Sequence, residues 1–148
     1  MFLPVNERQF EFWRLRRDGI TGAEIARSFS VSRQSVSKAL QGMDSKVSRV
    51  LLEMAQSNHI EIAKVNFERG VLFGRSVQLK TDAIIFISAK HGVQVWYRHD
   101  GDCGECSRAH ECEKLLREYA GEMGIALGES ESPAEMADEL FRKLEGII

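Results

Sequence analysis

The chain has 148 residues, of which 43% are hydrophobic and 28% are charged, and its formal net charge at pH 7 is −2. This mixture is typical of a soluble globular protein and excludes a disordered chain. No apolar run approaches the roughly 18 residues that cross a bilayer, and "MFLPVNERQF" has neither the basic start nor the apolar core of a secretory signal. We therefore expect a cytoplasmic protein without a membrane partner.

The charge is distributed unevenly along the chain. Residues 1–50 contain nine Lys or Arg and five Asp or Glu, a net charge of +4. Residues 51–148 contain eleven Lys or Arg and seventeen Asp or Glu, a net charge of −6. A basic N-terminal segment is compatible with binding to nucleic acid.

The first two predicted helices begin at recognisable capping residues. Asn6 with Gln9 forms a capping-box pattern, and the helix that follows ends at Gly19. Thr21 caps a second, short helix that ends near Phe29.

Two further helices are predicted before residue 58. Ser32 caps a third helix that ends at Gly42, and Asp44 caps a fourth. The apolar stripe of the fourth helix either closes a small core, pairs with a second copy or connects two domains. Its residues are Val47, Val50, Leu51, Met54 and Ala55.

Beyond Asn58 the sequence predicts three or four β-strands followed by two helices. "IEIAKVNF" alternates with a phase slip at Ala63–Lys64, and the last two strands form a hairpin around "KHG". Trp96 and Tyr97 point to opposite faces of one strand, so at most one is expected in the core. A helix over "AHECEKLLREYAGEMG", a short strand at "IAL" and a last helix that opens with Ser132 complete the chain.

Apolar residues of the second and third helices follow the register of a helix-turn-helix. With Gly22 as the first position, Ala26 stands at the fifth, where the helices touch and a small side chain is needed. Ser30 occupies the turn, where glycine is usual because the backbone tends toward positive φ. The fourth, eighth, tenth, fifteenth and eighteenth positions are all apolar: Ile25, Phe29, Val31, Val36 and Ala39.

The outward face of the third helix is polar and basic, and it consists of Ser32, Arg33, Gln34, Ser37, Lys38 and Gln41. Arg and Lys donate to guanine, and Gln pairs with adenine. We expect Arg33, Gln34, Ser37 and Lys38 in the major groove, and Gln41, Thr21 and Arg27 near phosphates. The alternative is a solvated helical hairpin with no DNA partner.

The stretch "NERQFEFWRLRRDGITGAEIARSFSVSRQSVSKAL" resembles the helix-turn-helix shared by sigma factor region 4, LuxR-type regulators and archaeal Tfx-type regulators. The resemblance covers roughly residues 3–55 and is carried by "GITGAEIA" and "VSRQSVSKAL". It implies a helical DNA-binding domain and a role in transcription. Ser30 in place of the turn glycine and Trp13 in place of an aliphatic residue depart from the pattern.

All three cysteines fall in "HDGDCGECSRAHEC", residues 99–112. Cys103 and Cys106 form a C-x2-C pair, and Cys112 follows five residues later. With His99 or His110 as the fourth ligand, they would suit a tetrahedral zinc ion. An iron–sulfur cluster is the weaker alternative, because three local cysteines leave it one ligand short.

Two other interpretations of the cysteines are open. Cys112 shares an apolar helix face with Leu116 and Tyr119, and a free cysteine packs like a small hydrophobe. A C-x2-C pair between a strand and a helix is also a place for a redox dithiol. The acidic neighbours oppose thiolate formation in the absence of a cation; they are Asp100, Asp102, Glu105, Glu111 and Glu113.

Together these patterns predict an α+β protein with two domains. Residues 1–56 form an all-α helix-turn-helix domain, and residues 60–148 form a small α+β domain for sensing or dimerisation, with a mainly antiparallel sheet and two helices. The expected function is a sequence-specific transcriptional regulator that binds double-stranded DNA as a homodimer.

Two other functions are retained. The chain could be a protein-interaction module of the transcription machinery, or a thiol-based redox sensor. We do not expect an enzyme, because the sequence contains no phosphate-binding glycine loop, no nucleophile elbow and no pair of catalytic carboxylates.

Overall fold

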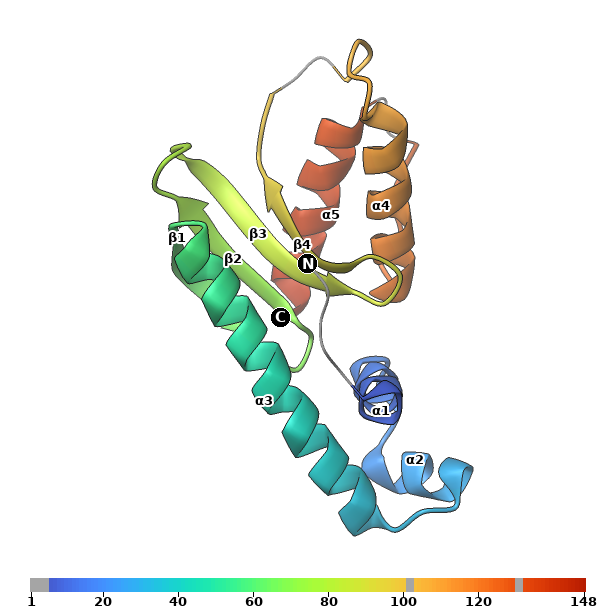
Figure 1. The fold of residues 1–148 in the computed structure, drawn as a ribbon. Coiled ribbons are helices and arrows are strands. Elements are labelled where there is room, and N and C mark those ends of the chain that lie inside the picture. The colour runs from blue at the N-terminus through green and yellow to red at the C-terminus, as the bar shows by residue number, and fades with distance from the viewer. Residues whose placement is uncertain (1–5, 101–102, 130–131) are drawn as a thin grey trace.

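The computed structural model describes residues 6–100, 103–129 and 132–148. Three helices, four strands and two further helices follow one another, which confirms the predicted α+β class (Figure 1). The helices are α1 (Glu7–Arg17), α2 (Gly22–Phe29), α3 (Arg33–Ser57), α4 (Ala109–Glu122) and α5 (Pro133–Ile147). The strands are β1 (Ile60–Asn66), β2 (Val71–Ser76), β3 (Thr81–Ser88) and β4 (Gly92–Tyr97). In the described part of the chain, no helix is long and apolar enough to cross a membrane.

The four strands form one antiparallel sheet in chain order. Each strand pairs with the next, and the expected hairpin is the β3–β4 pair. The phase slip expected at Ala63–Lys64 is a bulge, because Ile62 pairs with Gly74 while Lys64 pairs with Phe73. The broken alternation in the sequence therefore has a direct structural counterpart.

Helices cover both faces of the sheet (Figure 1). Leu72 of β2 belongs to the core beneath α3, whereas its neighbours Val71 and Phe73 belong to the core beneath α4 and α5. As expected, only one of Trp96 and Tyr97 is a buried core residue. Trp96 is buried in the second core and Tyr97 packs against the first, because each face of the sheet has its own helical cover.

The predicted break between a third and a fourth helix is wrong. Residues 33–57 form a single helix of 25 residues. Gly42 lies inside this helix at the contact with α1, where an added Cβ would lie 3.0 Å from the side-chain nitrogen of Gln9. Asp44 is not a cap, because its carboxylate accepts hydrogen bonds from both Nη atoms of Arg16. Both residues lie where α1 packs on α3, and neither of them ends a helix.

The remaining helix boundaries are confirmed by hydrogen bonds. Gly19 follows α1 with a φ of 93°, and Ser30 follows α2 in the left-handed region with a φ of 54°. Serine tolerates this conformation at a cost on the order of 1 kcal/mol. The predicted N-caps each accept a backbone N–H from the first turn of their helix; they are Asn6, Thr21, Ser32 and Ser132.

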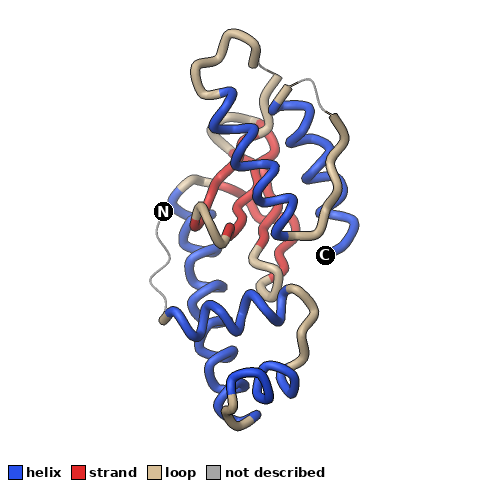
Figure 2. Tube along the Cα trace, turned by 90° about the vertical axis from the view of Figure 1, so that its right-hand side faces the viewer, coloured by secondary structure: helices blue, strands red, loops and turns tan. Residues whose placement is uncertain are grey.

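The expected short strand at residues 125–127 does not form. These residues are neither helix nor strand and link α4 to α5. Ile125 and Leu127 pack against the second core, so their apolar side chains are covered without pairing to the sheet. Figure 2 shows α4 and α5 beside the strands, with α1 and α2 at the opposite end of the molecule.

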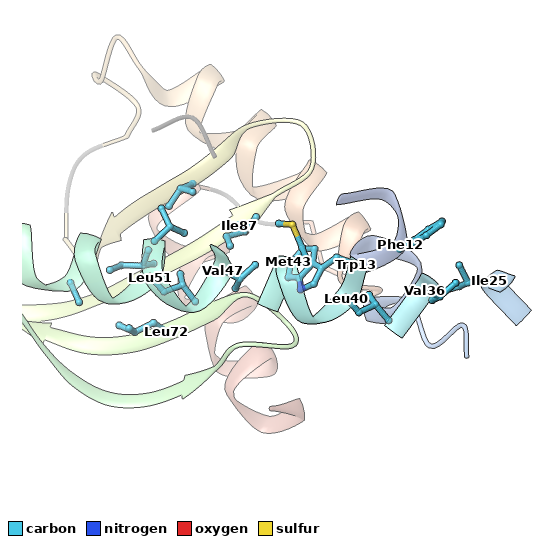
Figure 3. Close-up of a cluster of buried hydrophobic side chains, with 14 of the residues drawn as sticks. Phe12, Trp13, Ile25, Val36, Leu40, Met43, Val47, Leu51, Leu72 and Ile87 are labelled. Atoms are coloured by element: carbon cyan, nitrogen blue, oxygen red, sulfur yellow. The ribbon is translucent and has the colours of Figure 1, made fainter. Parts of the chain in front are cut away.

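A row of buried side chains follows α3 along its length (Figure 3). Val36 lies near Ile25 at one end, and Leu51 lies near Leu72 of the sheet at the other. Trp13 of α1 and Ile87 of β3 belong to the same cluster. The division into residues 1–56 and 60–148 stays a prediction, and this hydrophobic core continues across its boundary.

Candidate nucleic-acid interface and cysteine segment

The α2–α3 pair has the packing that its sequence predicts. Ile25, Ala26 and Val36 are buried. The other three apolar positions of the motif are partly buried against the same cluster: Phe29, Val31 and Ala39. The register of a helix-turn-helix is therefore satisfied at each predicted position.

Helix α1 packs against the middle section of α3. Arg16 forms a two-pronged ion pair with Asp44, and Lys46 Nζ donates a hydrogen bond to Gln9 Oε1 at 2.9 Å. These contacts lie beyond the second turn of α3. The first turns of α3, beginning at Arg33, pack on α2 through Val36 and leave their polar face uncovered.

The eight residues expected to contact DNA are all exposed: Thr21, Arg27, Ser32, Arg33, Gln34, Ser37, Lys38 and Gln41. Among the described residues, the ion pairs do not involve Arg27, Arg33 or Lys38. Within that part of the chain, these three positive charges have no acidic partner and remain available to an anionic partner.

Two of these eight residues already hold the ends of helices. Thr21 Oγ1 accepts the backbone N–H of Glu24 at 3.2 Å, and Ser32 Oγ accepts the backbone N–H of Ser35 at 3.0 Å. Each hydroxyl keeps its own O–H for an outside acceptor such as a phosphate oxygen. Thr21 and Ser32 therefore shape the turn in addition to any contact with a partner.

Sequence reasoning missed one further cation at this end of the molecule. The guanidinium of Arg8 lies 5.8 Å from the centre of the Phe29 ring, which brings α1 beside the turn between α2 and α3. Arg8 is exposed. Its position in the first turn of α1 carries no signal of this neighbourhood, because the crossing of α1 over the helix pair is a tertiary feature.

Comparisons of the chain with protein-family models, with curated proteins and with solved structures found no match. The resemblance of residues 3–55 to known helix-turn-helix regulators stays a prediction from their motif.

The cysteine segment connects β4 to α4. The backbone N–H of Cys106 donates to the carbonyl of Cys103 at 3.3 Å, which forms a tight turn between the two thiols. Cys106 is exposed and Cys103 is half-buried, whereas Cys112, in the first turn of α4, packs against the second core. Gly101 and Asp102, which also belong to the predicted segment, lie outside the described residues.

Helix α4 confirms the predicted apolar face. Leu116, Tyr119 and Met123 are buried, and Cys112 lies on the same side of the helix. Burial raises the pKa of the Cys112 thiol; Cys106, Cys103 and Glu111 add to the shift, and Arg108 opposes it. Without a cation, Cys112 is therefore a weak nucleophile.

The predicted ligands are not assembled into a metal centre. Within residues 6–100, 103–129 and 132–148, no three His, Cys, Asp or Glu side chains are grouped as a metal ion would require. His110 is exposed at the start of α4. His99 Nδ1 lies 2.9 Å from the carbonyl oxygen of Tyr97, and donation by Nδ1–H to that oxygen would leave Nε2 available as a ligand. This hydrogen bond to the other ring nitrogen favours His99 over His110 as the fourth ligand.

The zinc site stays a prediction and can be tested by metal content. We expect anaerobically purified protein to contain about one zinc ion per chain, because three thiolates and one imidazole complete a tetrahedral set. The Cys103→Ser variant should lose the ion, and His99→Ala should weaken its binding more than His110→Ala. Elemental mass spectrometry measures all three effects. Iron with visible absorbance would indicate an iron–sulfur cluster instead, and protein without metal would contradict both versions.

Proposed function

We propose that the chain is a sequence-specific DNA-binding transcriptional regulator that inserts the first turns of α3 into the major groove. The observation that carries the proposal is the exposed polar face that begins at Arg33, supported on a helix pair with the packing of a helix-turn-helix. Such a helix meets base edges with its N-terminal residues. An acid-free, uncovered face at this position suits that role.

The proposed contacts divide into two kinds. Arg33, Gln34, Ser37 and Lys38 reach base edges, because their side chains offer the donors and acceptors that distinguish base pairs. The residues around them position the protein on the phosphate backbone. These are Thr21, Arg27, Ser32 and Gln41, and we include Arg8 because it is exposed and lies beside the turn between α2 and α3.

Replacing Arg33 with alanine tests the proposal. After selection of a preferred sequence from random duplexes, we expect Arg33→Ala to weaken binding to that sequence by about 1–3 kcal/mol, because a bidentate contact to a base is lost. Fluorescence anisotropy with a labelled duplex measures the affinity. The loss should be smaller on duplexes of unrelated sequence.

Arg49→Ala is the matched control. Arg49 is exposed on the same helix, and it lies about 24 Å farther along the axis at 1.5 Å per residue. Its replacement should leave the affinity for the selected duplex nearly unchanged. Equal effects of the two variants, or no effect of either, would remove α3 from the proposed interface.

Salt dependence separates this function from the protein-interaction alternative. Phosphate contacts release condensed counterions, so the affinity for duplex DNA should fall steeply as the salt concentration rises. The proposed homodimer further predicts a selected sequence with two related half-sites about one helical turn apart. Absence of measurable binding to any duplex at low salt would favour a protein partner.

A further inference from the structure

A cavity of about 620 Å³ lies between the sheet and α5, on the face of the sheet away from α3. Its walls come from all four strands and from one side of α5. This volume is in the range of sites that hold small molecules. The cavity is distant in sequence from the helix-turn-helix and has no part in the proposed contacts with DNA.

The floor of the cavity is apolar and largely aromatic. Phe73, Ile84, Trp96 and Phe141 line it, and each is a core residue that remains only 6–8% exposed. The rings of Trp96 and Phe141 lie 6.3 Å apart at an angle of 49°. A flat apolar group could rest on this floor and bury its surface against rings that are already held in place by the core.

The rim of the cavity is charged, with an excess of acids. Five carboxylates and two guanidinium groups line the cavity: Asp82, Glu135, Asp138, Glu139, Glu145, Arg98 and Arg142. Three of the acids are engaged in ion pairs with Arg75, Arg98 and Lys143. In the described chain, the ion pairs do not involve Glu135, Glu145 or Arg142, so two unpaired carboxylates face one unpaired guanidinium at the rim and leave an excess of negative charge near the aromatic floor. Lys64 Nζ donates to the backbone carbonyl of Glu145 at 3.2 Å.

We propose that this cavity binds an organic cation with an aromatic or other flat apolar body. The aromatic floor takes the apolar body, and a cation is attracted both to the faces of the rings and to the carboxylates of Glu135 and Glu145. A neutral analogue would keep only the apolar contacts. An anionic analogue would meet the excess of carboxylates on the rim.

Three probes with the same naphthylmethyl body and different charge test the proposal by isothermal titration calorimetry. They are 1-naphthylmethylammonium, 1-naphthalenemethanol and 1-naphthaleneacetate. We expect the cation to bind about tenfold more tightly than the alcohol, and the anion to bind more weakly than either. Equal affinities of the cation and the alcohol, or no binding of the cation, would overturn the proposal.

Two sets of variants locate the binding site. The double variant Glu135→Gln with Glu145→Gln should lower the affinity for the cation about tenfold and leave the alcohol nearly unaffected. Both positions are exposed, so the fold should be retained. Glu53→Gln, an exposed acid on α3, is the control and should change neither affinity. If the cation binds the double variant as tightly as the unaltered protein, its binding site lies elsewhere and the proposal fails.

A substitution in the floor provides an independent readout. Trp96→Leu should weaken the cation and the alcohol together, because both probes use the aromatic surface. Unchanged affinity of both probes would show that the aromatic floor is not part of the binding site. All of these titrations are made without DNA, so their outcome is separate from the outcome of the DNA-binding experiments.

Discussion

Replacing Trp13 with alanine is expected to lower the free energy of unfolding by about 3–5 kcal/mol, the usual cost of removing a buried aromatic side chain. Trp13 has no exposed surface. Its ring stacks on Phe10 with centroids 5.9 Å apart, and the guanidinium of Arg17 lies 4.9 Å from its centre. Gly70, at the turn between β1 and β2, lies so close that an added Cβ would be 2.7 Å from the ring. Trp13 therefore joins α1 to the sheet as well as to α3.

Urea denaturation followed by circular dichroism measures this loss. Leu52→Ala is the control, because Leu52 lies on α3 and is 44% exposed. Its replacement should cost less than about 1 kcal/mol. A similar small loss for Trp13→Ala would contradict the placement of the indole ring in the shared core.

Replacing Glu122 with glutamine is expected to lower the free energy of unfolding by about 3 kcal/mol, because it breaks a buried ion pair and leaves a charge without its partner. The side chains of Arg17 and Glu122 are 3% and 14% exposed, and Arg17 Nη2 lies 3.3 Å from Glu122 Oε1. Ser88 Oγ donates to Glu122 Oε2 at 2.6 Å, and the backbone N–H of Ala89 donates to Oε1. The other Nη of Arg17 donates to the carbonyl of Ile87 at 2.9 Å. The glutamine amide has only one accepting oxygen, so its NH2 group would face one of the groups that now donate to the carboxylate. The guanidinium of Arg17 would also lose its anionic partner.

Glu118→Gln is the matched control on the same helix. Glu118 pairs with His91 at 3.0 Å and with Lys90 at 3.3 Å near the surface. Although its partial burial opposes ionisation, the hydrogen bonds from His91 and Lys90 hold the pKa of this carboxyl below its usual value. Surface pairs contribute little, so Glu118→Gln should lower the free energy of unfolding much less than Glu122→Gln does. Equal losses for the two variants would contradict the distinction between a buried and a surface pair.

A double variant isolates the effect of the unpaired charge. Arg17→Met combined with Glu122→Gln removes the guanidinium together with its partner, so part of the stability lost in Glu122→Gln should return. The same urea denaturation measures the free energy of unfolding of the double variant. If the two side chains do not act as a pair, the losses are additive. The double variant would then be less stable than Glu122→Gln by the whole loss that Arg17→Met causes alone.

Sequence reasoning predicted the features that depend on near neighbours along the chain. Asn6, Thr21, Ser32 and Ser132 cap helices because each side chain bonds to a backbone N–H two or three residues later. The phase slip at Ala63–Lys64, which the structure shows to be a bulge in β1, was predicted for a similar reason, since alternation along a strand is a local property. For the proposed interface, the exposure of the polar face also followed from helical periodicity; its residues on α3 are Arg33, Gln34, Ser37, Lys38 and Gln41.

The errors concern residues whose role depends on distant partners. Gly42 and Asp44 have the composition of a helix end, yet α1 packs on one and forms an ion pair with the other, so α3 continues through both. Arg8 was missed beside Phe29 because the two residues meet only when α1 crosses the helix pair.

By itself, the sequence determined the class of the fold, the capped starts of the helices and the polar face of α3. Hydrogen bonds within a turn and the periods of helices and strands involve residues close together in the chain, and their patterns are visible in it. Only the tertiary structure decided the unbroken course of α3, the cavity beneath α5 and the pairing of Arg17 with Glu122. These two residues are 105 positions apart. Their contact depends on burial from several elements at once, and no local pattern encodes that burial.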